Sequence, residues 1–255
     1  TQILNNMKIK HLLCFIALCL SFTPGKAQQL SVMTLRNGAT VYIWEDKSKP
    51  DVFGMIAFKV GSVDDPEQYT GLAHYLEHVM FKGTQTIDAL DWEKEKPIYE
   101  KIIAKYDERA ALSDPAAREA IDKEINDLTR EAAQYAAGNE FSLLVDHMGG
   151  QGLNASTGYD QTEYHNSFPP SQFEKWLEIY SERLIDPVFR GFQTELEAVY
   201  EEYNMYNDDR GSRMREFIYE QAFGDHPYAR PIIGLPEHLK NPQLSKLIDF
   251  YNTWY

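Results

Sequence analysis

Three residues between positions 74 and 78 have the types and the spacing that metal-dependent hydrolysis requires. The segment 74–78 has the pattern H-x-x-E-H, and on a helix two histidines four residues apart project from one face. Two such imidazoles can bind one tetrahedral Zn²⁺, which lowers the pKa of a bound water to about 7. A carboxylate that is not a ligand can then take a proton from that water. The pattern predicts His74 and His78 as zinc ligands and Glu77 as the general base; the alternative is two exposed histidines beside a surface glutamate.

The remaining ligand is expected to be a carboxylate or an imidazole. Both cysteines of the chain, Cys14 and Cys19, lie in an apolar run at 12–22 that follows a short basic start, a pattern typical of a secretory signal peptide. Cleavage is expected after Ala27, so the mature chain would contain no thiolate ligand and no disulfide. The run is too short to anchor the protein in a bilayer. We therefore expect residues 1–27, upstream residues plus signal, to precede a periplasmic or extracellular domain at 28–255 without a stable membrane anchor.

The charge of the chain excludes one class of partner. The formal net charge is −14, and loss of the three lysines of the expected signal segment would make it −17. A surface this acidic repels the phosphate backbone of nucleic acids. We expect no nucleic-acid partner.

Turn signals and apolar periodicity outline the elements that must position these residues. Asn37-Gly38 favours a two-residue hairpin turn. Strands are expected at 32–35, 41–44, 52–60, 153–158 and 161–168, and the third of them reads as buried on both faces. Helices are expected at 71–81, 171–184, 193–206 and 213–223, with a last helix toward Tyr255.

The segment 91–138 differs in composition from the rest of the chain. It is rich in charged residues and alanine, with apolar residues at helical intervals on both sides of Ser113-Asp114-Pro115. Asp followed by Pro stops one helix and caps the next. The segment is predicted to be a solvated helical hairpin and an insertion into the main domain.

Three motifs in order resemble one known family. The segment 71–84 resembles the active-site helix of the pitrilysin and insulysin family, the inverzincins, which include the mitochondrial processing peptidases. The segments 149–169 and 192–203 resemble that family's edge-strand motif and the helix that supplies its third ligand. The resemblance implies an α+β fold with a mixed, largely antiparallel sheet and helices packed on one face. It also implies one zinc ion per chain.

Four acidic residues compete for the position of third ligand: Glu195, Glu197, Glu201 and Glu202. The resemblance implies Glu202, because the family pattern has a second acid seven residues before the ligand. Seven residues are nearly two helical turns, so Glu195 would share a face with Glu202 and orient a ligand. The two other glutamates are expected on a solvated face.

The family's edge strand pairs with the backbone of the substrate. By resemblance this role falls to Asn154, Ala155 and Ser156, and main-chain pairing would admit many extended peptide sequences. The alternative is an ordinary internal strand with a glycine-rich entry.

The resemblance implies a zinc endopeptidase that hydrolyses short or unfolded peptides. Family members pair two homologous halves, and the second half supplies groups that stabilise the oxyanion. The chain is therefore predicted to be the N-terminal metal-binding half of such a peptidase, C-terminally incomplete at its last helix. One alternative is a non-catalytic partner subunit of such an enzyme. Another is a metal-dependent lyase that shares H-x-x-E-H but uses a cysteine ligand.

Overall fold

The computed structural model describes residues 30–255, which divide into two compact units at residue 50. The first unit contains an antiparallel hairpin of β1 (Leu30–Thr34) and β2 (Thr40–Trp44). Its turn includes Gly38 at φ +88°, and the Asn37 side chain accepts a hydrogen bond from the Ala39 amide. The predicted hairpin is thus confirmed. The predicted signal segment lies outside the described residues.

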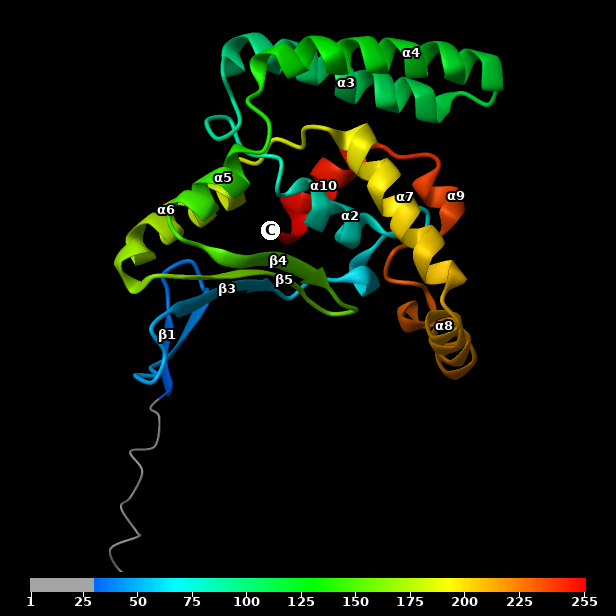
Figure 1. Ribbon diagram of the computed structural model, residues 1–255. Coiled ribbons are helices and arrows are strands. Elements are labelled where there is room, and N and C mark those ends of the chain that lie inside the picture. The colour runs from blue at the N-terminus through cyan, green and yellow to red at the C-terminus, as the bar shows by residue number, and fades with distance from the viewer. Residues whose placement is uncertain (1–29) are drawn as a thin grey trace, which may run out of the picture. The chain divides into compact units, whose positions relative to one another are not determined.

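The second unit is built on an antiparallel sheet with the order β3-β5-β4, in which β4 is an edge strand (Figure 1). The strands are β3 (Val52–Phe58), β4 (Gln151–Thr157) and β5 (Thr162–Phe168). The prediction that 52–60 is buried on both faces is wrong, because Phe53 and Met55 are 59% and 44% exposed. Alternate side chains of a strand point to opposite faces, and only one face of β3 packs on helices of this unit.

Helices of the second unit lie over one face of this sheet (Figure 1). They are α2 (Leu72–Val79), α5 (Glu140–His147), α6 (Phe173–Ile185) and α10 (Leu244–Trp254). Their buried side chains form one core with Tyr164 and Phe168 of β5. The predicted α+β class, with helices on one face of an antiparallel sheet, is confirmed.

The helix α5 is absent from the sequence predictions. It has only eight residues, and its two fully buried side chains are Phe141 and Val145. One apolar pair four residues apart does not distinguish a short helix from a loop. Its start follows two residues with positive φ, Gly138 and Asn139.

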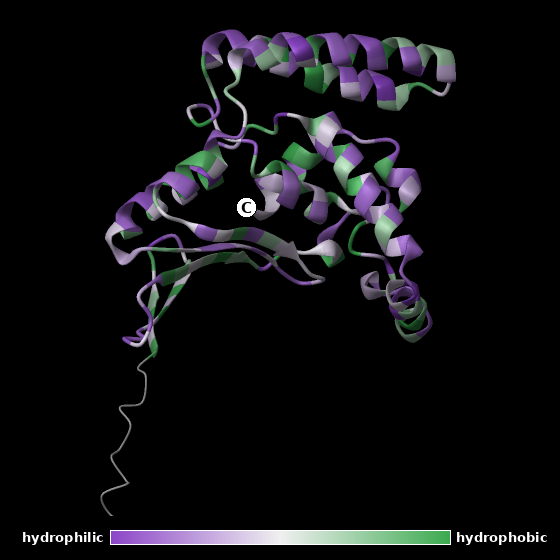
Figure 2. Cartoon of the chain, viewed as in Figure 1, coloured by the Kyte–Doolittle hydropathy of each residue, from purple (hydrophilic) through white to green (hydrophobic). Residues whose placement is uncertain are grey.

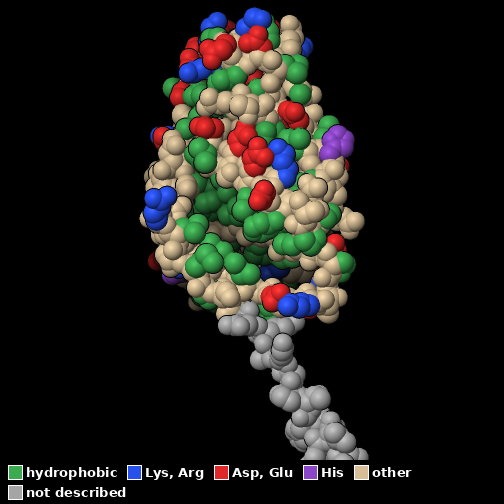
Figure 3. Space-filling view, turned by 90° about the vertical axis from the view of Figure 1, so that its left-hand side faces the viewer, with side chains coloured by type: hydrophobic (Ala, Val, Ile, Leu, Met, Phe, Trp, Pro, Cys, Tyr) green, Lys and Arg blue, Asp and Glu red, His purple; other side chains and the backbone are tan. Residues whose placement is uncertain are grey.

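The segment 91–138 forms two packed helices, α3 (Trp92–Ala111) and α4 (Pro115–Ala132). Asp91 and Asp114 cap them, each accepting a hydrogen bond from an amide of the first turn. Their surfaces are mainly hydrophilic (Figure 2), and acidic and basic side chains mix over this hairpin (Figure 3). The helical hairpin is as predicted, whereas its status as an insertion stays a prediction.

The last part of the chain adds three helices: α7 (Phe192–Asp208), α8 (Arg210–Phe223) and α9 (Pro236–Leu239). Four short 3₁₀ turns complete the described elements: η1 (Ser62–Asp64), η2 (Ala133–Tyr135), η3 (Pro170–Gln172) and η4 (Pro227–Ala229). The Tyr75 hydroxyl donates a hydrogen bond to the Phe192 carbonyl, which ties the start of α7 to α2. Between residues 30 and 255 no helix combines the length and the apolarity needed to cross a membrane.

Candidate active site

The helix α2 presents the H-x-x-E-H segment, and its N-terminus is held by a buried carboxylate. Asp65 accepts hydrogen bonds from the amides of Gly71 (2.7 Å) and Ala73 (2.8 Å). Burial raises the pKa of Asp65 to about 7, although these two hydrogen bonds act to lower it. Gly71 has φ +91°, and a β-carbon there would lie 2.5 Å from the Ile233 carbonyl oxygen. The start of α2 is therefore determined by a glycine and an aspartate that precede the motif.

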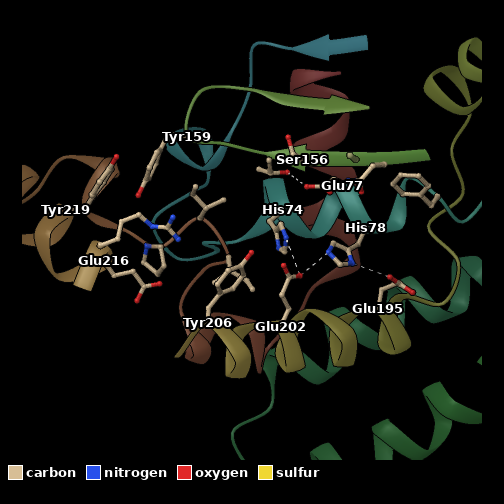
Figure 4. Close-up of a pocket in the computed structure, with 18 of the residues that line it drawn as sticks. His74, Glu77, His78, Ser156, Tyr159, Glu195, Glu202, Tyr206, Glu216 and Tyr219 are labelled. Atoms are coloured by element: carbon tan, nitrogen blue, oxygen red, sulfur yellow. Dashed lines mark hydrogen bonds and ion pairs between the residues drawn. The ribbon is translucent and has the colours of Figure 1, made fainter. Parts of the chain in front are cut away.

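Three ligand atoms converge between α2 and α7. The Nε2 atoms of His74 and His78 lie 3.6 Å and 3.5 Å from one carboxylate oxygen of Glu202 (Figure 4). The ligand atoms of this group all lie within 4.8 Å of one another, and no other such group occurs among residues 30–255. A tetrahedral zinc ion with ligand distances of 2.0–2.1 Å separates its donors by about 3.4 Å. The chemistry and the spacing of this donor set therefore fit zinc.

The structure distinguishes the four glutamates of α7. Glu202 faces both histidines, whereas Glu195 lies 3.4 Å from Nδ1 of His78, on the other side of that imidazole. Glu197 and Glu201 are exposed and line a separate groove between α7 and the α3–α4 hairpin. The structure thus places Glu202 near both Nε2 atoms and Glu195 near Nδ1 of His78.

The two histidines differ in their affinity for protons. Burial and the neighbouring charge of His78 lower the pKa of His74. Burial acts in the same direction on His78, but hydrogen bonds to Glu195 and Glu202 outweigh it and raise its pKa to about 9. In the metal-free protein at neutral pH, His78 thus carries a proton on the site where a metal would bind.

Glu77 lies beside the three predicted ligands but contributes none of the three converging atoms. It is 9% exposed, and Oγ1 of Thr157 donates a hydrogen bond to its Oε2 at 2.5 Å. Burial raises the pKa of Glu77, while the Thr157 hydrogen bond and the charge of His78 oppose the rise. A raised pKa brings a carboxylate closer to the range in which a general base works at neutral pH.

Asn154, Ala155 and Ser156 line the same pocket as the three predicted ligands, a cavity of about 700 Å³. They belong to the edge strand β4, which pairs with β5 on one side only. Glu216 and Tyr219 of α8 also line this cavity, and the ring of Tyr219 stacks on that of Tyr159 (Figure 4). A strand edge that faces a cavity leaves main-chain groups available to an extended peptide.

Three side chains at the site were missed from the sequence. Thr157 is the last residue of the strand β4 and directly follows Asn154, Ala155 and Ser156, which the sequence had singled out. Its position was therefore a usable signal. Lys82 pairs with Glu195, and a hydrogen bond from Tyr206 contributes to the lowered pKa of Glu202, after the larger effect of the His78 hydrogen bond. Lys82 lies within the matched segment 71–84 and Tyr206 lies three residues after the matched segment 192–203, but no spacing rule points to their partners.

Comparison with known proteins places this site in a family. The family model described as insulinase (Peptidase family M16) matches residues 40–96 and 127–235. An insulin-degrading enzyme homolog of Dictyostelium discoideum is 22% identical over 236 residues, 91% of this chain and 19% of that protein. The zinc protease PqqE of Helicobacter pylori is 24% identical over 227 residues, 88% of this chain and 40% of that protein.

The fold is also similar to that of a solved structure. The crystal structure of pitrilysin matches with a TM-score of 0.63 and 21% identity, over 91% of this chain and 20% of that one. The chain thus spans about one fifth to two fifths of the length of the proteins it resembles.

Proposed function

The chain belongs to the insulinase family, Peptidase family M16, and on this premise we propose that it is the metal-binding part of a zinc-dependent endopeptidase. The observation that carries the proposal is the convergence of His74, His78 and Glu202 beside the buried Glu77. His74, His78 and Glu202 would hold one zinc ion. When bound, zinc polarises a water molecule and the substrate carbonyl group.

Glu77 acts as the general base in this proposal. Its carboxylate takes the proton of the attacking water and passes it to the leaving amine. The hydroxyl of Thr157 holds one carboxylate oxygen, so the other oxygen is left to accept the proton. Because Thr157 ends the strand β4, the base is held by the element proposed to bind the substrate.

Short or unfolded peptides are the proposed substrates. An extended peptide would add to the open edge of β4, where Asn154, Ala155 and Ser156 face the cavity. Main-chain hydrogen bonds of this kind require an extended backbone and place few limits on side chains. Folded proteins, whose strands are already paired, would be poor substrates.

A second homologous half is the proposed partner, in the same polypeptide or as a separate subunit. The relatives are two to five times longer than the matched region. Removal of one oxyanion donor costs ~10²- to 10³-fold in rate. The 255-residue chain alone should therefore bind zinc and hydrolyse peptides poorly, and robust turnover by that chain would contradict this part of the proposal.

The proposed location is the periplasm or the extracellular space. This part of the proposal rests on the apolar segment at 12–22 alone. Fractionation of cells that produce the protein with its natural N-terminus would test it, and recovery of an unprocessed protein in the cytoplasm would contradict it.

The substitution Glu77→Gln in the complete protein tests the proposed reaction. Hydrolysis of an unstructured peptide should fall at least ~10²-fold, because general base catalysis is lost, while metal analysis should still find one zinc per chain. Glu201→Gln is a matched control, because Glu201 lies exposed on the same helix as the third ligand. A non-catalytic partner subunit would show no hydrolysis in either protein, and unchanged activity of Glu77→Gln would refute the assignment of the base.

A further inference from the structure

The carboxylate of Glu195 bridges an imidazole and an ammonium group. Its Oε2 lies 3.4 Å from Nδ1 of His78, and its Oε1 pairs with Nζ of Lys82. The side chain of Glu195 is 15% exposed and that of Lys82 is 34% exposed. In the described part of the chain, Lys82 is the one lysine or arginine that forms an ion pair with Glu195.

This bridge bears on which nitrogen of His78 faces the metal. Nε2 of His78 points to Glu202, so Nδ1 is the nitrogen that meets Glu195 (Figure 4). A carboxylate that accepts a hydrogen bond from the outer nitrogen of a ligating histidine fixes the tautomer and the ring orientation. The orientation of the Glu195 carboxylate therefore matters for the metal site.

The main chain at Lys82 is also held, by a hydrogen bond from Arg190. Nη1 of Arg190 donates a hydrogen bond to the Lys82 carbonyl oxygen at 3.2 Å. Nε and Nη2 of the same guanidinium donate to the two carboxylate oxygens of Glu95 at 2.6 and 2.8 Å, and Glu95 is 1% exposed. A bidentate buried pair of this kind has one geometry. It ties the main chain at Lys82 to Arg190, which lies two residues before the start of α7.

We propose that Lys82 is a positioning residue of the metal site: its ammonium group holds Glu195 so that the carboxylate orients His78 toward zinc. This inference rests on the proposed function, since it presumes that the site binds zinc. Lys82 lines the same cavity as the proposed ligands, and among the described residues its ammonium group forms an ion pair with Glu195 and with no proposed ligand. It acts through Glu195 alone.

The substitutions Lys82→Met and Lys82→Arg test this role in the purified protein. Methionine keeps most of the length of the side chain and removes the charge, whereas arginine keeps the charge. Zinc affinity, measured by competition with a chromophoric chelator, should fall ~10- to 100-fold in Lys82→Met, the range found when a residue that orients a ligand is lost. Lys82→Arg should restore the wild-type affinity.

Two further variants separate positioning from a general effect on stability. Lys175→Met breaks the exposed pair between Lys175 and Glu178 on α6 and should leave the zinc affinity unchanged. In a Glu195→Gln background, Lys82→Met should cause no further loss, because its only route to His78 is already gone. Thermal melting of the metal-free variants checks that all of them are folded.

The outcomes distinguish this inference from the function on which it rests. Wild-type affinity in Lys82→Met, or an equal additional loss in the Glu195→Gln background, overturns the role of Lys82 alone. A wild-type protein that binds no zinc overturns both the inference and the proposed function.

Discussion

Zinc affinity should depend steeply on pH, because His78 must lose a proton before it can bind the metal. Its pKa of about 9 means that roughly one molecule in a hundred has a neutral His78 at pH 7. A ligating imidazole has to be neutral, so zinc displaces that proton. The lowered pKa of His74 leaves its imidazole already neutral, and the lowered pKa of Glu202 leaves its carboxylate ionised. Of the three proposed ligands, His78 alone should release a proton.

The size of the effect follows from this single proton. Below the pKa of His78, zinc affinity should rise ~10-fold per pH unit, which is about 100-fold between pH 6 and pH 8. Isothermal titration calorimetry at pH 7, in buffers with different ionisation enthalpies, should count about one proton released per zinc. Chelator competition at several pH values measures the slope independently.

The variant Glu195→Gln provides the internal control for this prediction. It removes a carboxylate that raises the pKa of His78, so proton release at pH 7 and the slope with pH should both decrease. Affinity that is constant from pH 6 to pH 8, with no proton released, would show that His78 is neutral in the metal-free protein. The electrostatic reasoning for the site would then be wrong.

Two further predictions concern stability. Because the pKa of His78 in the folded protein lies above its unfolded value of 6.5, the resulting stabilisation of the metal-free protein is fully present below pH 6.5 and is lost as pH rises to about 9. It amounts to roughly 3 kcal/mol at most. Urea unfolding at several pH values would measure it, with a His78→Gln variant, which lacks this dependence, as the control. If the free energy of unfolding of the two proteins changed with pH in the same way, the prediction would be contradicted. Gly54→Ala would place a methyl group 2.6 Å from the Trp176 ring, so it should cost ~1–3 kcal/mol, and an unchanged urea midpoint would contradict that packing.

The part of the site that the sequence alone determines is the local part. A helix places residues four apart on one face whatever surrounds it, so His74, Glu77 and His78 could be assigned to one cluster from their spacing. The same regularity put Glu195 and Glu202 on a common face of α7. Predictions of this kind depend only on backbone geometry within one element.

Predictions from local sequence patterns failed where the burial of a side chain depends on other elements of the fold. The strand β3 reads as apolar throughout, yet Phe53 is exposed because helices of its unit cover only one face of the sheet. The helix α5 is too short for its two buried residues to form a pattern. In both cases the deciding contacts come from other elements: Gly54 of β3 faces Trp176 of α6, and Phe141 of α5 packs on Phe81 and Tyr180.

Tertiary structure decided how the acids of α7 face the two histidines and what holds the candidate site in place. By residue type the four glutamates of α7 were competing candidates, of which the family resemblance implied Glu202, and the packing of α7 against α2 turns Glu202 toward both histidines. The hydrogen bond from Thr157 to Glu77 and the pair between Lys82 and Glu195 likewise join separate elements. Sequence spacing fixes directions within a helix, whereas the distance between helices depends on the whole core. The proposed ligands on α2 could therefore be predicted from their spacing, whereas Glu202 was implied only by the family resemblance and its distance from the histidines only by the tertiary structure.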